Sequence, residues 1–121
     1  MRVLVIDDNE TFAKAVRRVL MTSDVENVEI ETDPTVAVQR IKAGEQFELV
    51  LCDVNMPGLN GREVRAAIAE HFTGARPPAV VLITGDDRGE DLDEDVLAKP
   101  FRAGDLQAIV HAVKLRAART R

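Results

Sequence analysis

The chain has 121 residues, of which 45% are apolar and 31% charged, a length that accommodates one compact domain and not two. Its formal net charge of -5 and its aromatic content of 3% argue against direct binding of nucleic acid. The single cysteine excludes a disulfide framework, and no apolar run approaches the roughly 18 residues of a membrane span. We therefore expect a soluble, cytoplasmic domain with no membrane or nucleic-acid partner.

Short apolar runs alternate with amphipathic segments along the chain. The solid Val, Leu and Ile runs predict strands that are buried on both faces, as in parallel sheets. They occupy 3–6, 28–30, 47–52, 79–83 and, more weakly, 96–98. Apolar residues at helical spacing predict helices that include 12–20, 38–41, 64–68 and 106–113. This alternation predicts an α/β fold with a doubly wound, five-stranded parallel sheet.

Polar residues mark where several of these helices begin and end. Asp33 followed by Pro34 has the form of an N-cap with proline at the first helical position. Gly44 stands where that helix should stop. Asn60 and Gly61 precede the third predicted helix, after a turn rich in proline and glycine.

Charged and polar residues follow four of the predicted strands. They are Asp7 and Asp8 after the first, Asp53 after the third, Thr84 after the fourth and Lys99 after the fifth. In doubly wound sheets, ligands bind beyond the carboxyl ends of the strands, so these side chains should converge. Each residue alone is explained by a turn or a cap, but three carboxylates on one edge repel one another unless a cation binds them. Carboxylate oxygens suit Mg²⁺.

The same set of groups suits phosphoryl transfer to a carboxylate. Asp53 would attack phosphorus as a nucleophile. The metal ion and Lys99 would neutralise the phosphoryl oxygens, and Thr84 would donate a hydrogen bond to one of them.

Four segments resemble the receiver (REC) domain of two-component response regulators, in the CheY-like superfamily. They are MRVLVIDDNE, LVLCDVNMPGLNG, VLITGDD and LAKPF, and the resemblance covers nearly the whole chain. It implies a flavodoxin-like strand order 2-1-3-4-5 and a single receiver domain over residues 1–121. It also implies a phosphoacceptor switch in a two-component or phosphorelay system, which promotes its own phosphorylation and dephosphorylation and is not a metabolic enzyme. The partners implied are a histidine kinase or a histidine phosphotransfer protein, and an output protein or fused effector.

The resemblance also assigns a role to each metal-binding residue. Asp53 is the expected phosphoacceptor and a ligand of Mg²⁺. Asp8 is expected to bind the metal directly, Asp7 through a water molecule, and Asn55 through its backbone carbonyl.

Two further residues take roles by resemblance. Thr84 is the expected switch hydroxyl, which moves toward the phosphoryl group, and Lys99 is its charge partner. The peptide bond between Lys99 and Pro100 is expected to be cis, against a general frequency of about 5% for such bonds.

Three residues with reactive side chains fall outside this constellation. His71 and His111 lie on predicted helix faces and are expected to be solvated. Cys52 neighbours Asp53 on the same strand, where successive side chains point to opposite faces, so we expect it to be buried.

Other classes of protein remain open at this point. A haloacid-dehalogenase-like phosphatase also uses an aspartyl phosphate and Mg²⁺, but carries a second acid where this chain has Asn55. A flavodoxin-like cofactor module needs hydroxyls and amides where this chain has Asp7 and Asp8. A pseudo-receiver that binds partners without phosphorylation would not need the complete set of groups found here.

The segments 85–95 and 114–121 bear on the oligomeric state and on how the chain continues. The residues from Gly85 to Glu94 number ten, too few for a helix of about 11 residues and its two loops. Residues 86–95 hold seven acids and one arginine, a net charge of -6 that favours a solvated loop. We expect the helix that receivers have here to be absent or very short, which leaves a common dimerisation surface incomplete and the protein a monomer. The basic segment 114–121 fits either a solvated helix end or the start of a linker.

Overall fold

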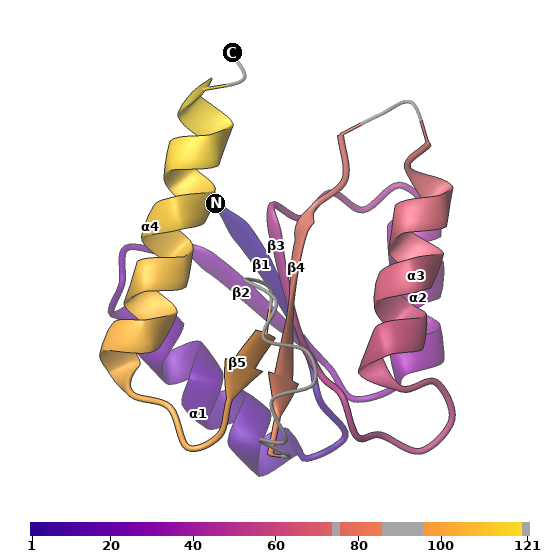
Figure 1. Cartoon of the computed structure of the whole chain (residues 1–121), viewed down its shortest axis with the longest axis horizontal. Helices are drawn as coiled ribbons and strands as arrows, with labels where there is room; N and C mark the ends of the chain where they lie inside the picture. Colours follow the sequence, from indigo (N-terminus) through magenta and orange to yellow (C-terminus); the bar gives the residue numbers. More distant parts are fainter. Residues whose placement is uncertain (74–75, 86–95, 120–121) are drawn as a thin grey trace.

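The computed structural model describes residues 1–73, 76–85 and 96–119, which form a parallel sheet between two layers of helices (Figure 1). The strands are β1 (Arg2–Ile6), β2 (Asn27–Glu31), β3 (Leu49–Asp53), β4 (Ala79–Thr84) and β5 (Val96–Ala98). The helices are α1 (Glu10–Met21), α2 (Pro34–Lys42), α3 (Gly61–His71) and α4 (Ala103–Arg119). All strand pairs are parallel, in the order β2-β1-β3-β4-β5, which confirms the predicted fold.

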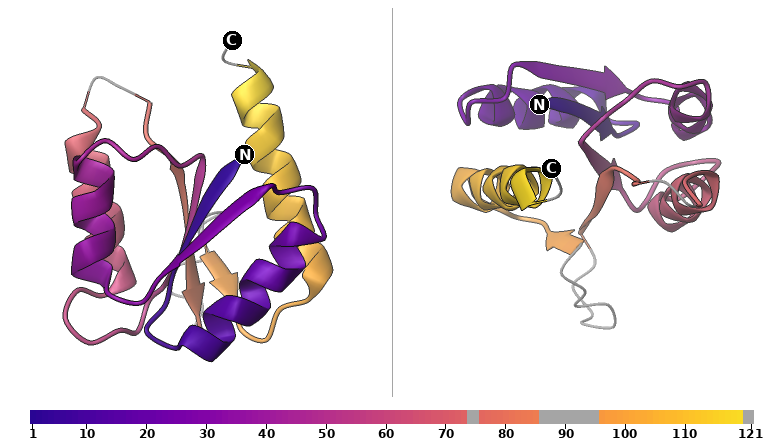
Figure 2. Two further views of the ribbon diagram at one scale, coloured as in Figure 1. Left: turned by 180° about the vertical axis from the view of Figure 1, so that it is seen from behind. Right: turned by 90° about the horizontal axis from the view of Figure 1, so that it is seen from above.

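The two faces of the sheet are covered by different pairs of helices. Figure 2 shows α1 and α4 together on one side of the sheet and α2 and α3 on the other. Val3 and Val5 of β1 belong to the cluster that packs under α1 and α4, whereas Leu4 and Ile6 belong to the cluster under α2 and α3. Alternate side chains of one strand thus enter two separate cores, which explains why the run is solidly apolar.

The third strand differs from its predicted bounds of 47–52. It begins at Leu49 and ends at Asp53, so Phe47 lies outside the sheet. The Phe47 side chain is nevertheless buried, and the Arg2 guanidinium lies 4.4 Å from the centroid of its ring. The prediction that Phe47 belongs to the strand was therefore wrong, because this apolar side chain is buried by packing without strand pairing.

The helix ends follow the predicted polar residues. Asp33 accepts hydrogen bonds from the backbone of α2, and Asn60 forms a capping box with Glu63 at the start of α3. Gly44 follows α2 with a φ of 109°, a conformation that side chains disfavour. Asn9, which the sequence analysis did not single out, caps α1 by accepting from the Phe12 N–H.

Residues 114–119 continue helix α4, which agrees with the interpretation of this basic segment as a helix end. The prediction that a linker begins near residue 114 stays a prediction. The predicted loss of a helix within residues 85–94 falls almost wholly on residues 86–95, outside the described residues. No helix in the described part of the chain is long and apolar enough to cross a membrane.

Candidate functional site

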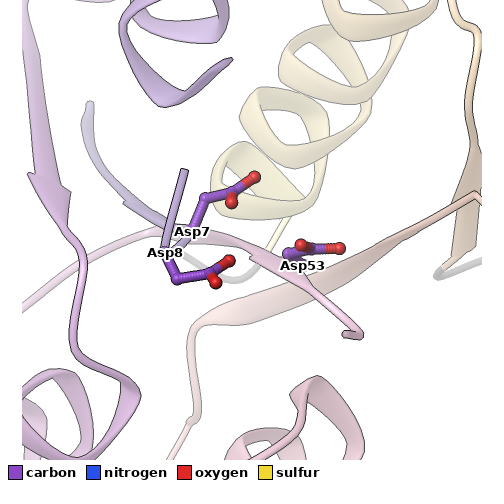
Figure 3. A group of neighbouring side chains, drawn as sticks. All are labelled: Asp7, Asp8 and Asp53. Atoms are coloured by element: carbon purple, nitrogen blue, oxygen red, sulfur yellow. The ribbon is translucent and has the colours of Figure 1, made fainter. Parts of the chain in front are cut away.

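Three carboxylates meet at the carboxyl edge of the two central strands (Figure 3). Asp7 and Asp8 directly follow β1, and Asp53 is the last residue of β3. Because Ile6 pairs with Cys52, the sheet register brings Asp7 beside Asp53. One oxygen from each acid lies within 4.8 Å of one oxygen from each of the others. The predicted convergence of these acids is therefore present in the structure.

Asp7 and Asp53 are the two buried acids among the described residues, with 1% and 7% of their surface exposed. Asp7 Oδ1 accepts a hydrogen bond of 2.9 Å from the Asn9 N–H, but Oδ2 is buried with no partner among the described residues. A buried oxygen without a donor is unfavourable, and a cation ligand would satisfy it. The donor set, made of hard carboxylate oxygens, fits a divalent cation such as Mg²⁺.

The surroundings of the cluster raise the pKa of two of its acids. Burial raises the pKa of Asp7, and the charge of Asp53 raises it further. Burial likewise raises the pKa of Asp53, which the charge of Lys99 opposes. The protein therefore holds these acids in an environment that disfavours their ionised form.

Lys99 and Thr84 complete the edge. Lys99 Nζ lies 3.9 Å from Asp53 Oδ1, and the Lys99 N–H donates a hydrogen bond of 2.7 Å to the Thr84 carbonyl. Thr84 ends β4 and is partly buried. The Lys99–Pro100 peptide bond is cis, as expected from the resemblance. Asn55 is exposed just beyond Asp53, and its N–H donates to Asp53 Oδ1 at 3.4 Å.

Gly61 supports the site in a way that sequence reasoning missed. A Cβ atom at this position would lie 2.6 Å from the Asp53 carbonyl oxygen and 2.9 Å from Val54 Cα. The Gly61 N–H donates a hydrogen bond to the Val54 carbonyl at 3.0 Å. The sequence predicts Gly61 only as a residue that precedes a helix, whereas in the structure it allows α3 to start against the backbone at the end of β3.

The remaining reactive side chains lie away from the cluster. His71 and His111 are exposed on α3 and α4, as predicted. Cys52 is fully buried under α2 and α3, and burial raises the pKa of its thiol to about 12. None of the three belongs to the acidic edge.

One class of phosphoacceptor domains combines an α/β fold of this strand order with an acidic cluster and a lysine at the carboxyl edge of the sheet. Comparison with known proteins identifies the family. The family model of the response regulator receiver domain matches residues 3–111, so the chain belongs to this family. It is a receiver domain of two-component signalling, a phosphoacceptor switch and not a conventional enzyme. Receiver domains take phosphoryl groups from histidine kinases or phosphotransfer proteins.

The curated relatives that the chain matches differ greatly in length. The transcription factor SKN7 of Chaetomium thermophilum is 31% identical over 90% of this chain, and the osmosensing histidine protein kinase SLN1 of Saccharomyces cerevisiae is 25% identical over 91%. The chain spans only 15% and 10% of those two proteins. Chemotaxis protein CheY-3 of Vibrio cholerae is 29% identical over 88% of this chain and is 86% covered by it.

Solved structures support the fold. A response regulator receiver domain protein from Clostridium thermocellum superposes with a TM-score of 0.84 at 22% identity, covering 99% of this chain and 98% of the other. The response regulator TrrA of Thermotoga maritima, solved with Mg²⁺ and BeF, has a TM-score of 0.78 at 23% identity, covering 93% and 97%. The match to the receiver family model, and not the structural similarity, sets aside the phosphatase and flavodoxin-like alternatives.

The contact at Gly61 predicts a loss of stability on substitution. Gly61→Ala should lower the free energy of unfolding by about 1 to 3 kcal/mol, because the new methyl group overlaps backbone atoms that cannot rotate away. Urea unfolding followed by circular dichroism measures this. Gly104→Ala is the matched control: its Cβ meets nothing within 4 Å, so it should be neutral or stabilising by up to about 1 kcal/mol. Equal effects of the two substitutions would contradict the close approach.

The raised pKa of Asp7 predicts that its charge weakens the metal-free fold. Its ionisation is less favourable in the folded than in the unfolded state, so this destabilisation is present at neutral pH, declines as the pH falls below the raised pKa and is absent below the ordinary pKa of the unfolded chain. Asp7→Asn should therefore melt at a higher temperature than wild type at pH 7.5 in EDTA, with a smaller difference at acid pH. The control Asp33→Asn keeps an N-cap of equal quality and should change little. A lower melting temperature for Asp7→Asn would refute the prediction.

Proposed function

We propose that this receiver domain accepts a phosphoryl group on Asp53 from a histidine kinase or a histidine phosphotransfer protein, in a reaction that depends on Mg²⁺. The observation that carries the proposal is one constellation: three acids within 4.8 Å of one another, with Lys99 Nζ 3.9 Å from Asp53. Family membership supports it, because the match to the family spans residues 3–111 and so includes every residue of this set.

The metal would be held by Asp8 and Asp53, by Asp7 through water and by the backbone carbonyl of Asn55. The unpartnered Asp7 Oδ2 and the burial of two of the acids support a bound cation. When bound, Mg²⁺ supplies positive charge that offsets the negative charge of the acids and of the phosphoryl oxygens.

The side chains of the chain itself perform the transfer. An oxygen of the Asp53 carboxylate attacks phosphorus and forms a P–O bond as the P–N bond of phosphohistidine breaks. The leaving imidazole keeps that electron pair and takes up a proton. The Lys99 ammonium neutralises a phosphoryl oxygen, and the Thr84 hydroxyl donates a hydrogen bond to another.

The same groups would promote hydrolysis of the aspartyl phosphate by water, so the domain assists both its phosphorylation and its dephosphorylation. Movement of Thr84 toward the phosphoryl group would pull on β4 and β5, because the Thr84 carbonyl accepts the Lys99 N–H. This displacement is the proposed origin of the change in the partner-binding surface.

We also propose that residues 1–121 form a single receiver domain, which is cytoplasmic and monomeric. Its output is either a separate protein or a fused effector, since the curated relatives include much longer proteins whose names describe a kinase and a transcription factor.

Magnesium should stabilise the folded protein. At a free Mg²⁺ concentration ten times its Kd, the expected gain in the free energy of unfolding is about 1.4 kcal/mol, because the unfolded chain offers no comparable site. Thermal melts with and without Mg²⁺ measure the gain. Asp8→Ala should lose it, whereas Glu10→Gln, an exposed acid next to the cluster, should retain it. No shift in wild type at millimolar Mg²⁺ would mean that the acids do not form a metal site.

Phosphorylation should be visible as a change in mass. Intact-mass analysis after incubation with acetyl phosphate and Mg²⁺ should reveal one added phosphoryl group on wild type and none on Asp53→Asn, which keeps the shape of the acceptor without its nucleophile. EDTA should suppress the reaction. An unmodified wild-type protein would favour a pseudo-receiver, and a modified Asp53→Asn protein would place the acceptor elsewhere.

A further inference from the structure

The ammonium group of Lys99 lies near two side chains that come from distant parts of the chain. Lys99 Nζ is 3.9 Å from Asp53 Oδ1 and 4.1 Å from the centroid of the Phe12 ring. A cation at this distance over an aromatic face is attracted by the negative charge density of the ring. Lys99 is therefore attracted by two groups at once.

The Phe12 ring is itself fixed in place. It lies in the first turn of α1, where the Phe12 N–H donates a hydrogen bond of 3.1 Å to Asn9 Oδ1. The ring is partly buried against the cluster under α1 and α4, and it packs edge-on against Phe101 with centroids 5.9 Å apart. Asn9 in turn donates its N–H to Asp7 at 2.9 Å, so the acidic edge and the ring share one short segment.

A lysine needs such support more than the other groups of the site do. Its side chain has four rotatable carbons and a strongly hydrated charge, and 31% of it is exposed here. The contact with Asp53 at 3.9 Å is longer than a hydrogen bond and leaves the ammonium other positions. A second attraction, to the Phe12 ring, limits those positions to the neighbourhood of Asp53.

We propose that Phe12 is a positioning residue, whose aromatic face holds the Lys99 ammonium beside Asp53, ready for the charge that develops on the phosphoryl oxygens. This inference rests on the proposed function of Asp53. It differs from a packing role, which any apolar side chain of similar size would fill. Phe12→Leu removes the ring and keeps an apolar side chain, whereas Phe12→Tyr keeps the ring face.

The chain has no tryptophan to serve as a fluorescent reporter, so intact mass measures the phosphorylation rate with acetyl phosphate and saturating Mg²⁺. Phe12→Leu should react about three- to tenfold more slowly than wild type, at limiting and at saturating donor alike, which is the range expected from losing one cation–π contact. Phe12→Tyr should restore the rate to within about twofold. Affinity for Mg²⁺, from thermal melts, should be unchanged in both variants.

Phe47→Leu is the matched control. Phe47 is another phenylalanine with a cation on its face; it is buried, and it precedes β3 at the end of the sheet opposite to Asp53. Its substitution should lower stability and leave the phosphorylation rate unchanged. A similar loss of rate in Phe47→Leu and Phe12→Leu would overturn the proposal, because it would trace both effects to general destabilisation.

Nuclear magnetic resonance tests the contact without phosphorylation. The Lys99 Hε protons should be shifted upfield by the ring in wild type and in Phe12→Tyr, and should move downfield in Phe12→Leu or, if that variant does not fold, in Phe12→Met. A wild-type protein that shows this shift but takes no phosphoryl group would refute the proposed function and leave the contact intact. An unshifted Lys99 in wild type, or a wild-type rate in the non-aromatic variant, would refute the positioning role.

Discussion

The rest of the structure must accommodate one constraint, the crowding of carboxylates at the ends of β1 and β3. In the strand order β2-β1-β3-β4-β5 these two strands are adjacent, so their carboxyl ends lie side by side at one edge of the sheet. Burial and mutual repulsion both oppose ionisation of Asp7 and Asp53. The separate apolar clusters on the two faces of the sheet stabilise the fold enough to hold this unfavourable arrangement.

Much of this edge could be predicted from the sequence once the strand order was known. Parallel strands end on the same side of the sheet, and the order implied by the resemblance makes the first and third strands neighbours, so the acids that follow them should approach each other. The solid apolar runs identified the strands, and the residues after them identified the edge. No knowledge of rotamers or packing was needed to bring Asp7, Asp53 and Lys99 together.

The features that were missed depend on tertiary contacts between distant segments. Helical periodicity assigned Phe12 to an apolar stripe, and the stripe is real, but periodicity does not reveal that the ring also meets Lys99. The sequence predicts a helix start at Gly61, but it does not reveal that the helix begins against the Asp53 backbone, where a side chain would overlap. Phe47 looked like a strand residue because burial, and not pairing, determines apolar composition.

A second charged network responds to pH in the opposite sense to the acidic edge. Glu45, after α2, pairs with Arg40 and Arg2, and the hydrogen bond from Arg40 lowers the pKa of Glu45 to about 2. The stability from this pairing is present above the unfolded pKa and is lost as the pH falls toward 2. Burial raises the pKa of Asp7, so a fall in pH removes electrostatic destabilisation at the acidic edge while it weakens the Arg40 network. In the metal-free protein, we therefore expect loss of stability at acid pH to come from the Arg40 network. We expect loss of stability at neutral pH to come from the acidic edge.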